Sequence, residues 1–146
     1  MRDTKILLVE DNEGDILLTL EAFRQASITK HIDVVRDGEE AIQYLNKKNQ
    51  YTDAETPDLI FLDINLPRVD GKEVLQHVKS TEMLANIPVI MLTTSDAKED
   101  IDECYNKGVN CYITKPADLK IFFDVIKLIR DFWIMTAKLP NTRTNG

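Results

Sequence analysis

Apolar and polar positions divide the chain into five repeated pairs of segments. Five short apolar runs are strand-like, and they lie near residues 5–9, 32–35, 59–62, 87–92 and 111–113. Each is followed by a stretch with helical spacing of apolar residues; these stretches lie near residues 14–27, 38–47, 71–80, 97–107 and 118–136. Strands that alternate with helices predict an α/β fold of the (βα)5 type, in which right-handed crossovers place helices on both faces of a doubly wound parallel five-stranded sheet.

The length of the chain fits one domain. The 146 residues, 43% of them hydrophobic, supply one well-buried core and leave no room for a second, so we expect a single domain over residues 1–146. Residues 47–57 are polar and lack a hydrophobic period, which predicts a long solvated loop. Residues 138–146 are typical of a flexible C-terminal tail.

Composition excludes several classes of function. The net charge of −7, without a local cluster of Lys and Arg, opposes binding to nucleic acid. The first ten residues contain only four consecutive apolar positions, too few for a signal peptide or a membrane span, so we expect a cytoplasmic protein without a membrane partner. The two cysteines and two histidines favour neither a disulfide framework nor a zinc site.

Charged residues follow three of the apolar runs. Glu10 and Asp11 come after the first run, Asp63 after the third, and Lys115 after the fifth. In an open parallel sheet, the carboxyl ends of neighbouring strands meet at a ligand-binding crevice. Three carboxylates in one crevice require a cation, and Mg²⁺ satisfies them while it keeps positions for water and a phosphate oxygen. The sequence therefore predicts a site that handles phosphoryl groups.

Four motifs resemble the phosphoacceptor signature of two-component receiver domains and together span nearly the whole chain. They are Val9-Glu10-Asp11, residues 62–67 with Asp70-Gly71, Leu92-Thr93-Thr94 and Thr114-Lys115-Pro116. The 30-residue separation of Asp63 and Thr93, and the position of Tyr112 three residues before Lys115, also follow the family pattern. The resemblance implies the flavodoxin-like receiver fold, with strand order 2-1-3-4-5, and a response regulator rather than a conventional enzyme.

By this resemblance, Asp63 is the phosphoacceptor and takes the phosphoryl group as an acyl phosphate, in a reaction that the domain itself helps to catalyse. Glu10 and Asp11 hold Mg²⁺ together with Asp63 and the backbone carbonyl of Asn65. Taken alone, Asp63 is equally suited to cap a helix N-terminus, and the pair Glu10-Asp11 would be an ordinary solvated loop.

The family also implies roles for residues near the fourth and fifth apolar runs. Lys115 presents its ammonium group to the phosphoryl oxygens, and a cis bond to Pro116 points it into the site. Thr93 donates its hydroxyl to a phosphoryl oxygen, and Tyr112 changes rotamer when Thr93 moves toward the phosphate. The local alternatives are a surface lysine, a β-branched residue at a strand end and a half-buried strand residue.

Two other functions remain open from the sequence. One is a Mg²⁺-dependent phosphatase or phosphotransferase that turns over through an aspartyl phosphate. Such an enzyme requires a second acid two residues after the nucleophile, where this chain has Asn65. A non-phosphorylated pseudo-receiver, which acts only as a binding module, is expected to lack some of Asp11, Asp63, Thr93 or Lys115. All four are present.

Further details resemble the small stand-alone regulators that serve cyanobacterial phytochrome histidine kinases. They are residues 11–15, Asn110-Cys111-Tyr112, Phe132-Trp133 and Leu139-Pro140. This resemblance implies that the partner is a sensor histidine kinase, a phytochrome, and that the signal leaves through a protein partner or through self-association.

Residues 119–135 carry more apolar surface than one face of a sheet requires, because 12 of the 17 residues are apolar. At about 100° per residue, one stripe suits packing on the sheet; it consists of Phe122, Ile126, Ile129 and Trp133. A second stripe consists of Ile121, Leu128, Phe132 and Met135. An open stripe of this kind predicts an interface, and two-fold symmetry lets it pack on its own copy, so we expect a homodimer. The alternative is burial under the tail from residue 137 onward.

Overall fold

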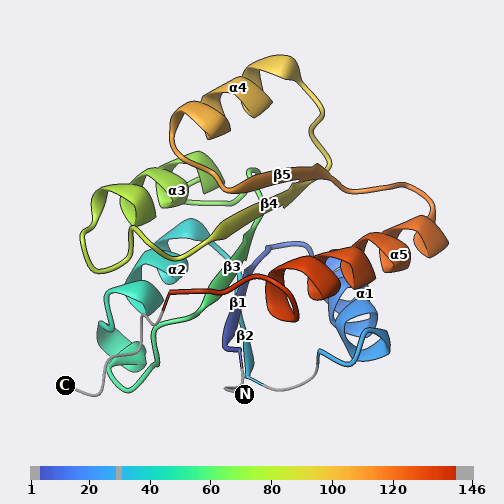
Figure 1. Ribbon diagram of the computed structural model, residues 1–146. Helices are drawn as coiled ribbons and strands as arrows, with labels where there is room; N and C mark the ends of the chain where they lie inside the picture. Colours follow the sequence, from blue (N-terminus) through green and yellow to red (C-terminus); the bar gives the residue numbers. More distant parts are fainter. Residues whose placement is uncertain (1–3, 29–30, 141–146) are drawn as a thin grey trace.

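The computed structural model describes residues 4–28 and 31–140. Within these ranges, five strands form one parallel sheet in the order β2-β1-β3-β4-β5, which confirms the predicted fold class (Figure 1). The strands are β1 (Ile6–Val9), β2 (Ile32–Val35), β3 (Leu59–Leu62), β4 (Val89–Thr93) and β5 (Cys111–Thr114). Each strand begins and ends within two residues of its predicted range.

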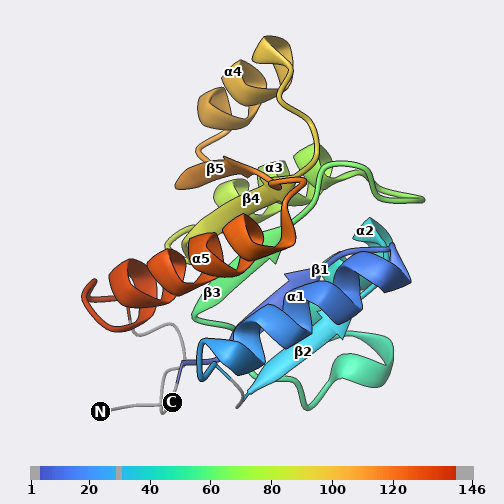
Figure 2. The ribbon, with the colours of Figure 1, turned by 90° about the vertical axis from the view of Figure 1, so that its right-hand side faces the viewer.

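Helices cover both faces of the sheet, as predicted. They are α1 (Glu13–Gln25), α2 (Gly38–Leu45), α3 (Gly71–Ser80), α4 (Lys98–Asn106) and α5 (Leu119–Ile129). Helices α1 and α5 lie side by side on one face, α2 and α3 lie on the other, and α4 stands at the β5 edge (Figure 1 and Figure 2). The side chains of Asn12, Asp37, Asp70 and Asp118 cap α1, α2, α3 and α5. None of the described helices is long and apolar enough to cross a bilayer.

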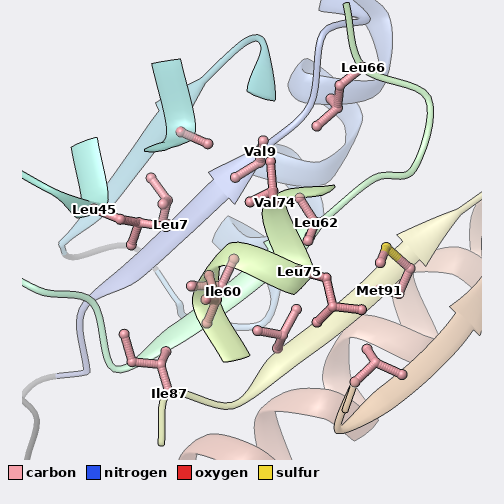
Figure 3. Close-up of a cluster of buried hydrophobic side chains, with 14 of the residues drawn as sticks. Leu7, Val9, Leu45, Ile60, Leu62, Leu66, Val74, Leu75, Ile87 and Met91 are labelled. Carbon is pink, nitrogen blue, oxygen red and sulfur yellow. The ribbon is translucent and has the colours of Figure 1, made fainter. Parts of the chain in front are cut away.

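The core has two apolar layers, one on each side of the sheet, because successive strand residues point to opposite faces. Ile6 and Leu8 of β1 pack with Phe23 of α1 on one side. Leu7 and Val9 of the same strand pack with side chains of α2 and α3 on the other side (Figure 3). Burial of each large aliphatic side chain contributes roughly 1.5–3 kcal/mol to folding, so both layers hold the strand ends in place.

The predicted loop over residues 47–57 contains a short 3₁₀-helix, Asn49–Tyr51. The Tyr51 hydroxyl donates a hydrogen bond to Glu40 Oε2 of α2 (2.8 Å), and the Tyr51 ring lies against Tyr44 with centroids 5.2 Å apart. These two contacts order a segment whose composition alone indicates a solvated loop.

The last helix departs from the prediction, which extends one helix to residue 136. Helix α5 ends at Ile129 and passes into a π-helical segment, Arg130–Ile134. The wider turn is closed by backbone hydrogen bonds over five residues, such as that from Met135 N–H to Arg130 O (3.0 Å). Of the predicted tail, residues 138–140 form neither helix nor strand, and residues 141–146 lie outside the described residues.

Candidate functional site

The carboxyl ends of β1, β3, β4 and β5 meet at one edge of the sheet, because the strands are parallel and paired in register. Backbone hydrogen bonds continue this register just beyond the strands. Asp63 N–H donates to Val9 O (3.1 Å), and Lys115 N–H donates to Thr93 O (2.6 Å). The side chains of Glu10, Asp63, Thr93 and Lys115 therefore start from fixed points of the sheet.

The ammonium group of Lys115 joins three of the carboxylates. Its Nζ donates to Glu10, and it lies 3.2 Å from Asp15 Oδ2 and 3.4 Å from Asp63 Oδ2. The exposed fraction of the side chain is 9% for Lys115, 3% for Glu10 and 10% for Asp63. These charged groups are largely removed from water, so each is stabilised mainly by the opposite charge beside it.

Burial changes the acidity of this group of residues. Removal from water raises the pKa of Glu10 from 4.5 to about 7, against the opposing effect of the hydrogen bond from Lys115, and the nearby charge of Asp63 adds to the rise. Burial alone lowers the pKa of Lys115, but the carboxylates of Glu10, Asp63 and Asp15 outweigh it and raise that pKa above its usual value. Lys115 is therefore a full positive charge at neutral pH.

Asp63 is held in a constrained position at the end of β3. Its Oδ1 accepts a hydrogen bond from Ile64 N–H (2.7 Å). The alternative role as a helix cap is wrong for Asp63, because Asp70 caps α3 by accepting from Glu73 N–H (3.0 Å). Helix α3 passes so close behind the site that a Cβ at Gly71 would lie 1.9 Å from the carbonyl oxygen of Asp63.

The remaining predicted residues lie around this centre. Asp11 and Asn65 are exposed beside Glu10 and Asp63, at the loops that follow β1 and β3. Thr93 is fully buried at the end of β4, and its Oγ1 accepts from Ser95 N–H (3.4 Å). Tyr112 is half-buried in β5, and its hydroxyl donates to Ser95 O (2.8 Å). Thr93 and Tyr112 therefore share one partner.

The bond between Lys115 and Pro116 is a correction to the sequence-based expectation. The resemblance implies a cis bond, but no peptide bond between described residues is cis, so this one is trans. The trans isomer is favoured by about 0.5–1 kcal/mol for a bond to proline. The ammonium group of Lys115 reaches Glu10 and Asp63 with the bond in trans, so its place in the site does not require the cis isomer.

The donors at this edge fit a hard divalent cation, because they are carboxylate and carbonyl oxygens and because Glu10, Asp15 and Asp63 share a single ammonium group. In the arrangement seen, no three Asp, Glu, His or Cys side chains of the described residues lie close enough together to hold a metal. Mg²⁺ is commonly held by one or two carboxylates with waters, and the exposed carboxylate of Asp11 can turn toward Asp63 without disturbing the packed core.

Sequence reasoning missed Asp15 and a pocket beside it. The pocket has a volume of about 450 Å³ between α1 and the start of α5, and Asp15, Leu18, Lys115, Pro116, Leu119 and Phe122 contribute to its wall. Asp15 lies in the first turn of α1, which begins at Glu13. An acidic residue in the first turn of a helix is common, because it favours the positive end of the helix, so the sequence carries no specific signal for Asp15 as a site residue.

The fold and the acidic edge define a doubly wound α/β protein with its site at the carboxyl ends of the strands. The family model of the response regulator receiver domain matches residues 6–127, most of the chain. The chain belongs to the response regulator receiver domain family.

Several relatives are similar over nearly their whole length. Response regulator Rcp1 of Synechocystis sp. is 41% identical over 135 residues, which are 92% of each chain. The crystal structure of the phosphorylated cyanobacterial phytochrome response regulator RcpA is 47% identical with a TM-score of 0.91, and the match covers 96% of this chain and 100% of that one. The Mn²⁺-bound form of Rcp1 is 40% identical with a TM-score of 0.89, over 94% and 99% of the two chains.

Proposed function

We propose that this response regulator is a phosphorylatable switch with Asp63 as its phosphoacceptor. The observation that carries the proposal is the buried contact of Lys115 with both Glu10 and Asp63. It places a permanent positive charge 3.4 Å from a constrained carboxylate, where a phosphoryl group on Asp63 would bring new negative charge. The relative RcpA, which has been crystallised in phosphorylated form, supports the same chemistry.

The proposed reaction is the transfer of a phosphoryl group from a phosphohistidine. An oxygen of the Asp63 carboxylate forms a bond to phosphorus, the P–N bond breaks, and its electron pair stays on the imidazole nitrogen, which then takes up a proton. Lys115 and the Thr93 hydroxyl balance the charge on the transferring oxygens, since phosphoryl transfer is chiefly a matter of positioning and electrostatics. Hydrolysis of the acyl phosphate by water returns the switch to its first state.

We further propose that Mg²⁺ is the cofactor. The carboxylates of Asp11 and Asp63, the carbonyl of Asn65, and Glu10 in part through water would hold it, and it would supply charge neutralisation at the phosphoryl oxygens. The Mn²⁺-bound form of the relative Rcp1 supports a divalent cation in this family.

The partner that donates the phosphoryl group is proposed to be a sensor histidine kinase of the phytochrome type, acting in the cytoplasm. Similarity to RcpA, which is described as a phytochrome response regulator, supports this assignment. Neither His31 nor His77 lies in a site motif, so the phosphohistidine must come from another protein. The net charge of −7 supports output through proteins rather than nucleic acid.

We also propose a homodimer joined through the second stripe of residues 119–135. Ile121, Leu128, Phe132 and Met135 are 53%, 66%, 57% and 62% exposed, whereas Phe122, Ile126 and Ile129 of the first stripe are buried against the sheet. Trp133 is half-buried and completes the first stripe. A row of large apolar side chains open to solvent is typical of an interface, and a two-fold axis makes it self-complementary.

The phosphoacceptor is tested with acetyl phosphate, Mg²⁺ and intact-mass detection. The wild-type chain should gain one phosphoryl group that hydroxylamine removes, and Asp63→Asn should gain none. Asp53→Asn, a change of the same kind at an exposed position, should behave as wild type. Phosphorylation of Asp63→Asn at the same site would refute the assignment. Steady hydrolysis of a phosphate ester, with no phosphoryl group accumulating on the chain, would instead favour the phosphatase.

A further inference from the structure

A cluster of charges outside the site joins α3 to α4. Lys72, the second residue of α3, donates from Nζ to Asp100 Oδ1 (2.6 Å) and to Glu103 Oε1 (2.8 Å). The side chains of Lys72 and Asp100 are 18% and 22% exposed. This ion pair is therefore better shielded from water than an ordinary surface ion pair. Its two side chains come from different helices, α3 and α4, which hold them in place.

The same cluster holds the loop that follows β4. Asp100 Oδ2 accepts a hydrogen bond from Ser95 Oγ (2.5 Å). The carbonyl oxygen of Ser95 accepts from the Tyr112 hydroxyl (2.8 Å), and its N–H donates to Thr93 Oγ1 (3.4 Å). Ser95 is thus the common partner of Asp100, Tyr112 and Thr93.

The other end of the cluster is attached to the backbone beside Asp63. Helix α3 begins at Gly71, whose N–H donates to Ile64 O (2.8 Å) and whose Cα has no room for a side chain next to the Asp63 carbonyl. The first turn of α3, which carries Lys72, is therefore in direct contact with the backbone at Asp63 and Ile64.

We propose that Lys72 is a positioning residue of the switch. It holds Asp100, and Asp100 holds Ser95 in the place where its carbonyl receives Tyr112. Lys72 thereby gives the backbone beside Asp63 a second connection to Tyr112, in addition to the one through Thr93. The proposal rests on the function proposed above, in which Asp63 is phosphorylated, and it requires that Tyr112 has two arrangements which both ends of the connection bias.

A second ion pair on α4 separates this role from a general effect of charge. Lys98 and Asp102 are 89% and 56% exposed and join α4 only to itself. The loss of Lys98 removes one positive charge from α4, the helix that Lys72 joins to α3, and breaks a contact to Asp102 rather than to Asp100. Lys98→Met is therefore the matched control for Lys72→Met.

The test follows Tyr112 by NMR in the full chain labelled at its tyrosine rings, with and without Mg²⁺ and beryllofluoride. The chain has only four tyrosines, and Tyr112→Phe identifies the signal. In Lys72→Met, the ratio of Ser95-bound to released Tyr112 should fall roughly fivefold, the lower end of typical coupling between sites. Asp100→Asn, which weakens the link between Lys72 and Ser95 at its middle, should also lower this ratio. Lys72→Arg should restore the ratio, and Lys98→Met should leave it unchanged.

Each outcome decides the proposal. An unchanged Tyr112 ratio in both Lys72→Met and Asp100→Asn would overturn it, and so would an equal change in Lys98→Met. A wild-type chain that gives no response to beryllofluoride would overturn the proposed function itself, whatever the variants do. A normal wild-type response with unaltered variants would reject only the role of Lys72.

Discussion

Lys115 brings one positive charge to three acidic side chains. Glu10, Asp15 and Asp63 all lie within 4 Å of Nζ, and Glu10 takes the closest contact. A phosphoryl group on Asp63 adds a further anion that competes for the same ammonium. Lys115 is therefore expected to leave Asp15, its most exposed partner, first, because that carboxylate is best solvated without it.

The first prediction at the residue scale concerns Asp11. Asp11→Asn should weaken Mg²⁺ binding roughly tenfold or more, because the proposed site loses an anionic ligand while its other residues remain. Isothermal titration with Mg²⁺ measures the effect. The control is Glu13→Gln, which removes one negative charge two residues further along the chain. It should change the Mg²⁺ affinity much less. Equal affinities of Asp11→Asn and wild type would remove Asp11 from the metal site.

Thr93→Ala tests the connection between the phosphoacceptor and Tyr112. The variant should still be phosphorylated at Asp63, though more slowly, because the missing hydroxyl no longer balances charge on the phosphoryl group. It should also reduce the response of Tyr112 to beryllofluoride, measured by NMR of β5, to the part that the connection through Lys72 carries. Thr94→Ala, at the adjacent exposed position, should retain that response. A full wild-type shift pattern in Thr93→Ala would contradict the role of Thr93.

Four of the residues that sequence reasoning found end a strand or directly follow one. Glu10, Asp63, Thr93 and Lys115 are brought together by strand register alone, and a parallel (βα)5 pattern already implies that register. The role of Asp15 was not predictable, because its approach to Lys115 depends on the direction in which α1 leaves the sheet. The prediction of a cis bond before Pro116 was wrong, because local sequence does not determine the isomer.

At the scale of elements, the start of α3 is fixed by contact with the site. Gly71→Ala should destabilise the protein by about 1–3 kcal/mol, because the new methyl group collides with the Asp63 carbonyl and forces the backbone to shift. Urea unfolding measures the loss, and phosphorylation of the folded fraction should also slow. Gly14→Ala, where the nearest atom is Asn12 Oδ1 at 3.2 Å, should change stability by less than about 1 kcal/mol. Equal stability of Gly71→Ala and wild type would show that α3 is free to move away.

Element boundaries were predictable where a cap or a strand end marks them. Asn and Asp residues begin four helices in the structure, and the expected starts lie within one residue of the observed ones. The π-helical segment after Ile129 was not predictable, because apolar residues continue at helical spacing through Met135 and carry no signal for a wider turn. The 3₁₀-helix at Tyr51 was not predictable either, because the hydrogen-bond partner of Tyr51, Glu40, lies eleven residues earlier in the sequence.

At the scale of the whole molecule, the two apolar stripes of residues 119–135 have different environments. Phe122, Ile126 and Ile129 are buried between α5 and the sheet, where they complete the layer that α1 also covers. The second stripe faces away from this layer and remains open, even though the chain turns into the π-helical segment before it ends. Phe132, in the π-helical segment, and Met135, directly after it, are exposed as Leu128 of α5 is.

The second stripe predicts the oligomeric state. Phe132→Glu combined with Leu128→Lys should yield a folded monomer that is still phosphorylated at Asp63, because the changes place charges in the proposed interface but lie outside the site. Sedimentation with and without beryllofluoride measures the state. The matched control exchanges charges on the solvated edge of the same helix, Lys120→Glu with Asp124→Lys, and should remain dimeric because both positions are exposed and polar. A wild-type chain that sediments as a monomer at tens of micromolar, in either condition, would refute the dimer while leaving the phosphoacceptor assignment intact.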